Sequence, residues 1–267
     1  MKLRTGWIAL CCVCVLAMPA LAGPPFGKGG TDILHLTLRT DFAPNADPDA
    51  TGSLGAKLRQ QGAADVQKLQ LEVGQLAPDA THRLFLWLRD AVDPVEVLAF
   101  DTDENGEASL KLMHIGHKNA SGKKFPGELD PLSDVLAMEI RDDAGTSVLL
   151  DADLTAPDRL GYLVKRRLTS DPAIDADAAG SLFLKESSKE GSAKVLFRLR
   201  AGNLDASTGY TLAFFAGLAE TTFPVTTDAD GRLELKELPV GAPAPFQMTG
   251  LELRNGTPDV VLSTELP

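Results

Sequence analysis

Asp101, Asp103 and Asn105 place three oxygen-bearing side chains at alternate positions, and Gly106 follows them. Calcium-binding loops begin in this way, because alternate oxygen ligands can surround a cation while glycine makes the bend. The twelfth position of such a loop holds a bidentate glutamate, but here it is Leu112. Asn-Gly between two apolar runs is also a hairpin signal. The sequence therefore favours a hairpin turn over a calcium site.

His114 and His117 lie close to Met113. Imidazole and thioether groups together suit copper, and imidazole suits several other metals. Positions three apart in a strand point to opposite faces, so both histidines could bind one metal only if the chain bends at Gly116. With no third ligand evident, we favour an exposed loop and keep metal binding as an alternative.

The segment 113–130 is longer than the matching segment 239–245 later in the chain, and it contains Lys118, Lys123 and Lys124. An enlarged loop with a basic tip on an acidic protein is a reasonable place for a partner to bind. A solvated connection is the simpler interpretation.

Phe85 and Trp87 alternate with leucines, which predicts a strand that is apolar on both faces. An outward aromatic pair could stack on a sugar ring or on a partner surface. Carbohydrate binding or hydrolysis with nearby carboxylates is therefore an alternative function. We favour the simpler explanation that a loop or a neighbouring part of the chain covers this strand.

The residues give little support for catalysis. We find no G-x-S-x-G, H-E-x-x-H or P-loop motif, and no G-x-G-x-x-G between a strand and a helix. A pair of catalytic carboxylates has no fixed spacing, but the acidic residues concentrate at turns such as 142–143 and 228–230. His35 and His82 each lie singly on a predicted strand. We expect a protein that is not an enzyme and has no cofactor.

The first 22 residues have the features of a secretory signal. Lys2 and Arg4 precede an apolar stretch, and Ala20-Leu21-Ala22 forms the small-residue box, so we expect cleavage after Ala22. All three cysteines lie inside this signal, so the mature chain would have no disulfide and no cysteine nucleophile. No later apolar run is long enough to span a membrane as a helix. We expect a secreted or periplasmic protein.

The rest of the chain contains an internal repeat. A shift of 128 residues aligns Gly52-Ser53-Leu54 with Gly180-Ser181-Leu182, and the order of further matches is kept. Asp103 and Gly106 then meet Asp228 and Gly231, while Glu139 and Arg141 meet Glu252 and Arg254. We interpret residues 31–153 and 158–267 as two copies, joined by a short segment near 155–158.

Both copies show strand patterns and no convincing amphipathic helix. Leu34, Leu36 and Leu38 alternate with polar residues, and Val195, Phe197, Leu199 and Ala201 share one face of a strand in the second copy. The other expected strands are 82–89, 95–100, 107–113, 134–141 and 147–152, with counterparts at 210–216, 221–226, 232–238, 247–254 and 259–264. Short strands separated by regular turns predict an all-β protein of two tandem antiparallel β-sandwich domains.

Residues 204–212 read Leu-Asp-Ala-Ser-Thr-Gly-Tyr-Thr-Leu. This segment resembles the tyrosine corner of fibronectin type III and immunoglobulin-like (Ig-like) domains, and the resemblance implies that the Tyr210 hydroxyl bonds back to the chain. The first copy keeps a proline at Pro78 but has Ala80 and His82 in the threonine and tyrosine places. The resemblance implies an Ig-like sandwich and no particular function.

The 26 basic and 37 acidic residues give a net charge of −11, which argues against a general nucleic-acid binder. Apolar residues make up 44% of the chain, enough for a hydrophobic core. We expect an exported binding, adhesion or envelope-structural protein with an unidentified protein or glycan partner. Its oligomeric state is open, because exposed edge strands could pair with another molecule.

Overall fold

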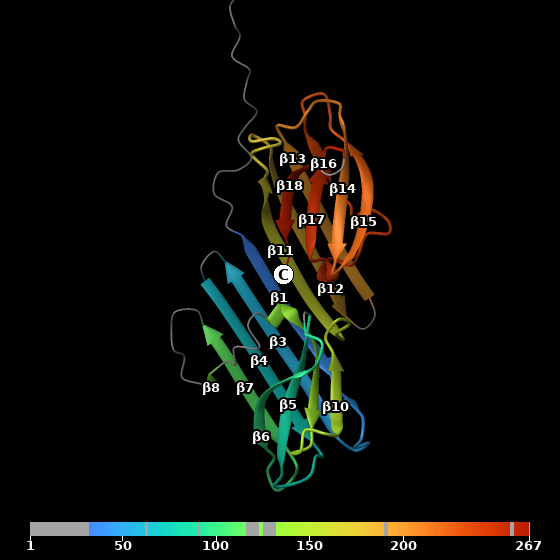
Figure 1. Cartoon of the computed structure of the whole chain (residues 1–267). Helices are drawn as coiled ribbons and strands as arrows, with labels where there is room; N and C mark the ends of the chain where they lie inside the picture. Colours follow the sequence, from blue (N-terminus) through green and yellow to red (C-terminus); the bar gives the residue numbers. More distant parts are fainter. Residues whose placement is uncertain are drawn as a thin grey trace, which may run out of the picture.

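The computed structural model describes residues 32–61, 64–89, 91–115, 123–124, 132–189, 192–256 and 259–266. This part of the chain is all-β, as expected, and its strands pair antiparallel except for one short parallel contact (Figure 1). The predicted signal lies outside the described residues. No described helix is long and apolar enough to cross a membrane.

Two sheets contain all the strands that the structure describes. The five-stranded sheet has the order β2 (Ala43–Pro44), β10 (Val148–Asp153), β9 (Val135–Arg141), β5 (Thr81–Leu88) and β6 (Val95–Asp101). The thirteen-stranded sheet contains β1 (Ile33–Asp41), β3 (Thr51–Gln61), β4 (Ala64–Gly74), β7 (Ala108–Ile115), β8 (Lys123–Lys124), β11 (Arg159–Ser170), β12 (Ala179–Lys189), β13 (Ser192–Gly202), β14 (Gly209–Ala216), β15 (Ala219–Thr226), β16 (Leu233–Leu235), β17 (Gly250–Arg254) and β18 (Val260–Glu265).

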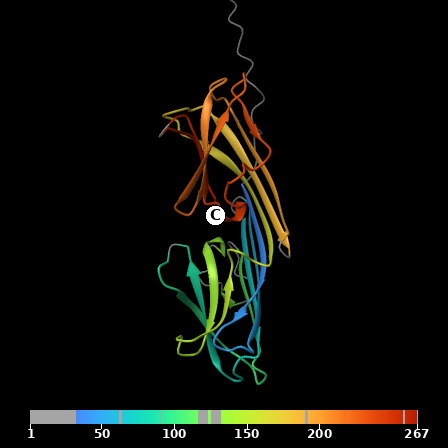
Figure 2. The ribbon, with the colours of Figure 1, turned by 90° about the vertical axis from the view of Figure 1, so that its right-hand side faces the viewer.

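The same strand order occurs in the first half of the chain, residues 32–154, and in the second half, residues 155–266. The order β1-β3-β4-β7 in the first half matches β11-β12-β13-β16 in the second, and β10-β9-β5-β6 matches β18-β17-β14-β15. Each half therefore has two layers, a long strand layer on one side and a smaller sheet packed against it (Figure 2). We call β10-β9-β5-β6 and β18-β17-β14-β15 the two small sheets, although β18 also pairs with the end of β11 and so makes the second one part of the thirteen-stranded sheet.

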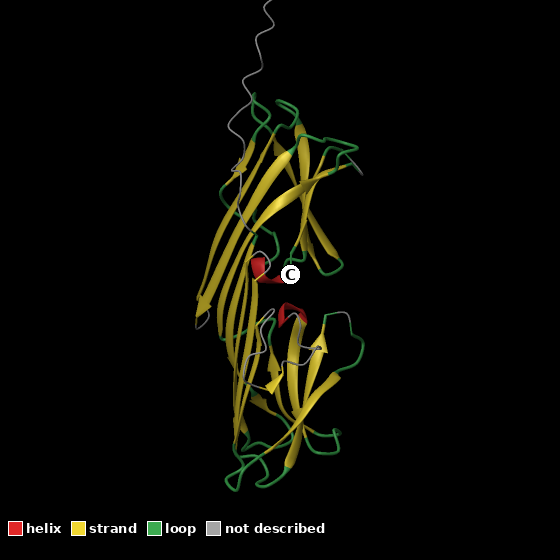
Figure 3. Cartoon of the chain, turned by 90° about the vertical axis from the view of Figure 1, so that its left-hand side faces the viewer, coloured by secondary structure: helices red, strands yellow, loops and turns green. Residues whose placement is uncertain are grey.

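The long strands of the two halves form one continuous surface because β1 pairs with β11, from Ile33 opposite Lys165 to Arg39 opposite Arg159. The seven strands β7-β4-β3-β1-β11-β12-β13 are called the shared sheet below; they run along one side of the molecule (Figure 3). We expected two tandem domains joined by a short segment, and the alternating sequence of β1 gave no sign of this pairing.

The β1–β11 register is symmetric about one residue pair. His35 lies opposite Leu163, which is 128 residues later, the same shift that aligns the two copies in sequence. On either side, Leu34 pairs with Val164 and Leu36 with Tyr162, and the shift exchanges these two pairs. An approximate twofold axis therefore passes between His35 and Leu163.

The hydrophobic core lies between the layers. Leu34, Leu36 and Leu38 are all buried, and so are Phe197, Leu199 and Ala201, as the alternation predicted. Val195, which we expected on the same buried face, is 40% exposed. The buried face of β13 therefore begins at Phe197, two residues later than expected.

Most expected strands are found within one or two residues of their predicted bounds. The expected strand 232–238 is shorter, since β16 ends at Leu235. The expected strand 247–254 begins only at Gly250, because Pro245–Gln247 form a short 3-10 helix, η3. Its counterpart in the first half is a second 3-10 helix, η2 (Leu132–Asp134).

Candidate functional site

The acidic turn at Asp101–Gly106 uses its oxygen atoms to hold itself together. Asp103 Oδ1 accepts hydrogen bonds from the backbone N–H groups of Asn105 and Glu107, both at 2.9 Å, and these bonds hold the pKa of Asp103 below its ordinary value. Asp101 Oδ1 accepts a bond from the Thr81 hydroxyl at 2.7 Å. Among the residues that the structure describes, no three His, Cys, Asp or Glu side chains are grouped to hold a metal ion.

The second half repeats this turn without the first aspartate. Asp228 Oδ1 accepts from the backbone N–H groups of Asp230 and Arg232, and Gly231, like Gly106, has a positive φ. A Cβ atom added at either glycine would collide with the carbonyl oxygen of Leu76 or Leu204. The repeated geometry identifies a structural turn that requires glycine.

Two buried threonines, which the sequence did not single out, tie these turns to the preceding loop. The Thr102 hydroxyl donates to the carbonyl oxygen of Ala77 at 2.6 Å, and the Thr227 hydroxyl donates to that of Asp205 at 2.6 Å. The matching positions of Thr102 and Thr227 in the aligned copies were the available signal.

The tyrosine segment also forms a structural corner. Tyr210 Oη accepts a hydrogen bond from the backbone N–H of Asp205 at 3.0 Å. In the first half, the buried His82 occupies this place and lies against Phe100, with ring centroids 5.9 Å apart. Both side chains are buried.

The predicted basic loop and histidine pair are described only in part. His117 and Lys118 lie outside the described residues, and only the backbone is described at His114, Lys123 and Lys124. The last two form β8, which pairs parallel with β7.

Phe85 and Trp87 lie half-buried on the outer face of the first small sheet, within a cluster of charged residues. Trp87 Nε1 donates to Glu139 Oε1 at 2.6 Å, and Arg141 Nε donates to the other oxygen of Glu139 at 2.8 Å. The Arg141 guanidinium lies over the Phe85 ring, 4.3 Å from its centroid. Arg141 therefore occupies the ring face on which a sugar would stack.

The outer face of the second small sheet repeats this arrangement. Arg254 pairs with Glu252 at 2.6 Å and with Glu220 at 2.8 Å, and its guanidinium lies 5.6 Å from the centroid of Phe215. These carboxylates raise the pKa of Arg254, with the Glu220 hydrogen bond as the largest cause. On both small sheets the cations are satisfied by carboxylates of the chain itself.

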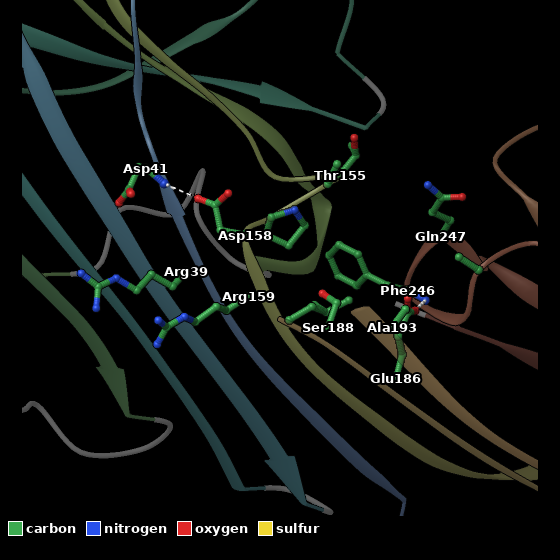
Figure 4. Close-up of a pocket in the computed structure, with 14 residues that line it drawn as sticks. Arg39, Asp41, Thr155, Asp158, Arg159, Glu186, Ser188, Ala193, Phe246 and Gln247 are labelled. Atoms are coloured by element: carbon green, nitrogen blue, oxygen red, sulfur yellow. Dashed lines mark hydrogen bonds between the residues drawn. The ribbon is translucent and has the colours of Figure 1, made fainter. Parts of the chain in front are cut away.

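Two cavities open where the halves meet. The larger, about 700 Å³, lies among the end of β1, residues 155–160, β12 and η3 (Figure 4). Its lining includes Glu186 of β12 and Phe246 of η3, and Asp158 Oδ2 beside it accepts a hydrogen bond from the backbone N–H of Asp41 at 2.9 Å.

The second cavity, about 480 Å³, shares Thr155, Phe246 and Gln247 with the first. Most of its remaining lining is apolar. Its other lining residues are Arg89, Ser133, Val135, Leu136, Leu154, Ala216 and Gly217. Volumes of this size are typical of sites that hold small organic ligands.

Buried side chains fix the two 3-10 helices at this junction. Glu186 Oε2 accepts from the backbone N–H of Phe246 at 3.0 Å, and Gln67 Oε1 in the first half accepts from that of Leu132 at 2.9 Å. The Phe246 ring meets Tyr162 edge-on, with centroids 5.6 Å apart. The two halves thus use different residues to hold matching helices.

Several polar atoms at the junction are buried without a partner in the described part of the chain: Tyr162 Oη, Arg89 Nε, Arg166 Nε and Ser133 Oγ. Burial raises the pKa of Tyr162. The charges of Arg166 and Arg89 act in the opposite direction, and that of Glu186 raises the pKa further. Buried polar groups normally have hydrogen-bond partners, so these four residues are candidates for contact with a ligand.

The junction was not predicted from the sequence, although two charged residues on apolar strand faces indicate it. Glu186 interrupts the buried face that Leu182 and Leu184 begin in β12, and Arg166 interrupts the buried face of β11. A charge on the apolar side of a strand is a useful marker, because burying it requires a partner.

No protein-family model, curated protein or solved structure shows a significant match to this chain.

Proposed function

We propose that this chain is an exported, non-enzymatic binding protein of two Ig-like β-sandwich repeats, residues 31–153 and 158–267, with its ligand site at the junction between them. The observation that carries this proposal is the position of Arg89. Arg89 lines the smaller cavity, its guanidinium makes one long hydrogen bond to the Ser133 carbonyl oxygen at 3.4 Å, and it has no ion pair among the described residues.

The lining of the smaller cavity defines the ligand class. A guanidinium binds carboxylates through paired hydrogen bonds, and a partly buried cation gains most from an anionic partner. Val135, Leu136 and Leu154 offer apolar surface beside it. A small amphipathic carboxylate matches this lining, because its carboxylate can bind Arg89 while its apolar tail packs on these three residues.

The sequence supports export and the repeat. Lys2, Arg4 and the Ala20-Leu21-Ala22 box form the proposed signal, and all three cysteines of the chain precede its cleavage site. The matching strand order of the halves supports a duplicated sandwich. Expression in a bacterial host should yield an exported chain that begins at Gly23. An exported chain that retains residues 1–22 would contradict the cleavage.

Titration calorimetry on the mature chain, residues 23–267, tests the ligand site with decanoate and with decanol. We expect decanoate to bind and Arg89→Gln to weaken it by about tenfold or more, since a charge-assisted contact is lost. Arg83→Gln, on the outer face of the small sheet, is the matched control and should leave binding unchanged. Failure of decanoate to bind, or equal affinity for decanol, would reject this ligand class.

A further inference from the structure

The outer face of the shared sheet carries a large unpaired positive charge. Successive residues in a strand point to opposite faces, and the leucines of β1, β3 and β4 define the inner one. The opposite positions in the first half hold the exposed Arg39, Lys57, Arg59, Lys68 and Lys111.

The second half continues the pattern across three more strands. The outward positions of β11, β12 and β13 hold the exposed Arg159, Lys165, Arg167, Lys185, Lys194 and Arg198. None of the cations named for the two halves has an ion pair within the described ranges. The charge therefore spans all seven strands of the shared sheet.

The outward positions also hold three carboxylates, Asp41, Glu72 and Glu234, which are too few to neutralise these eleven cations. Glu234 pairs with Arg200 at 2.8 Å, and Glu72 accepts a hydrogen bond from Gln70. The chain as a whole has a net charge of −11, so the positive face is a strong local departure from its composition. Charge of one sign gathered on one face is the usual electrostatic footprint of a polyanionic partner.

Some of these cations lie directly opposite one another in neighbouring strands. In the strand register, Lys57 of β3 lies opposite Lys68 of β4, and Arg39 of β1 lies opposite Arg159 of β11. Like charges directly opposite each other destabilise a sheet. An arrangement that costs folding stability on an open surface is explained by a partner that supplies the counter-charge.

His35, at the centre of this face, responds to the positive field. Burial lowers the pKa of His35, and the charges of Arg59 and Lys57 lower it further. His35 faces Arg59 on one neighbouring strand and the apolar Leu163 on the other. The region around the approximate twofold axis is therefore positive without any contribution from His35.

We propose that the outer face of the shared sheet docks on an anionic lipid surface. Strands are about 4.8 Å apart, so seven of them spread this charge over about 29 Å. A plane of negative headgroups can meet side chains from several neighbouring strands at once, whereas a linear polyanion follows only one row. No other described element covers this face (Figures 2 and 3).

The apolar residues of the face fit this choice of partner. Leu196, at 60%, is the only large apolar side chain here that is strongly exposed in the part of the chain that the structure describes, and Phe183 is half-buried. Among its described residues the face thus has no exposed aromatic platform for nucleic-acid bases. The net negative charge of the chain repels the same membrane and so orients the positive face toward it.

Sedimentation of the mature chain with vesicles tests the proposal. We expect binding to phosphatidylcholine vesicles that contain phosphatidylglycerol, none to phosphatidylcholine alone, and progressive loss of binding as salt is added. The double variant Lys57→Gln, Lys68→Gln should weaken binding by about tenfold, since each cation near an anionic surface contributes to it.

The matched control makes the same change in net charge elsewhere. Leu218→Glu together with Thr222→Glu alters exposed positions on and beside the second small sheet, and it should leave vesicle binding close to that of the original chain. Arg89→Gln should also leave it unchanged, which separates this proposal from the junction ligand site.

Three results would overturn the proposal. The first is no binding to the phosphatidylglycerol vesicles at low salt, and the second is an equal loss of binding in the control variant. The third is tighter, lysine-dependent binding to duplex DNA or to heparin than to the vesicles, which would assign the face to a linear polyanion. Denaturation midpoints of the variants check that each one is folded.

Discussion

The outer faces of the small sheets and of the shared sheet treat positive charge in different ways. On the small sheets, Arg141 is held by Glu139 and lies over Phe85, and Arg254 is held by Glu252 and Glu220. On the shared sheet, the exposed Lys57 and Lys68 lie directly opposite each other with no ion pair in the described part of the chain.

This difference separates a stabilising surface from a recognition surface. In a partly buried ion pair, removal of either residue destabilises the fold, because the remaining charge is left without a partner. Exposed cations that face each other contribute nothing favourable to the fold, and they leave the surface free to attract anions. The charges of the small sheets are thus accounted for by the stability of the fold, whereas those of the shared sheet are not.

The largest expected effect is the loss of a carboxylate from the paired face. Glu139→Ala removes the acceptor of both Trp87 Nε1 and Arg141, whose side chain is only 17% exposed. We expect a loss of about 2 to 3 kcal/mol in the free energy of unfolding, between the values for exposed and buried pairs. Urea denaturation measures it.

Glu96→Ala is the control on the same face. Glu96 binds Arg83 through both oxygens, at 3.0 and 3.1 Å, but its side chain is 40% exposed. Its removal should cost less than about 1 kcal/mol. Equal losses for the two variants would mean that burial does not distinguish these pairs.

A smaller effect of opposite sign is expected on the shared sheet. Lys57→Glu replaces a like-charge pair with an opposite-charge pair facing Lys68, and it should raise the free energy of unfolding by about 0.2 to 1 kcal/mol. Lys111→Glu is the control, because Lys111 faces the neutral Gln70. If Lys57→Glu gains no more than this control, the direct Lys57–Lys68 repulsion is negligible.

The strands could be predicted from the sequence because burial alternates along them. Leu34, Leu36 and Leu38 identify β1 and its buried face. They do not identify the neighbouring strand, since any strand with a matching apolar face would serve. The β1–β11 pairing depends on backbone groups that all sequences share, so the shared sheet could not be read from side-chain types.

The candidate sites were harder to predict for a different reason. Phe85 and Trp87 were identified by residue type, but the cover over Phe85 comes from Arg141, which lies far away in sequence on β9. The net charge of −11 is a sum over the whole chain, so it gave no sign of the basic face. The lysines and arginines at the outward positions of β3, β4 and β11 were visible, but their significance depends on these strands sharing one sheet.

The smallest expected effect is a change in the titration of His35. An unfolded chain protonates this histidine near pH 6.5, whereas in the folded protein its pKa is lowered by burial and by Arg59 and Lys57. As the pH falls through this interval, the unfolded state binds the proton first, so the folded state loses stability. Above pH 6.5 both states are neutral and this loss is absent.

Lys57→Gln should therefore raise the pKa of His35 toward 6.5 without reaching it, because burial, the largest cause, and Arg59 both remain. NMR titration of the imidazole measures the shift, and Lys194→Gln, on the distant β13, should leave it unchanged. Phosphatidylglycerol vesicles should raise the pKa of His35 as well, because a negative surface favours the imidazolium. A pKa of His35 that changes in Lys57→Gln but not with the vesicles would confirm the effect of the neighbouring cations and contradict the approach of an anionic membrane to this face.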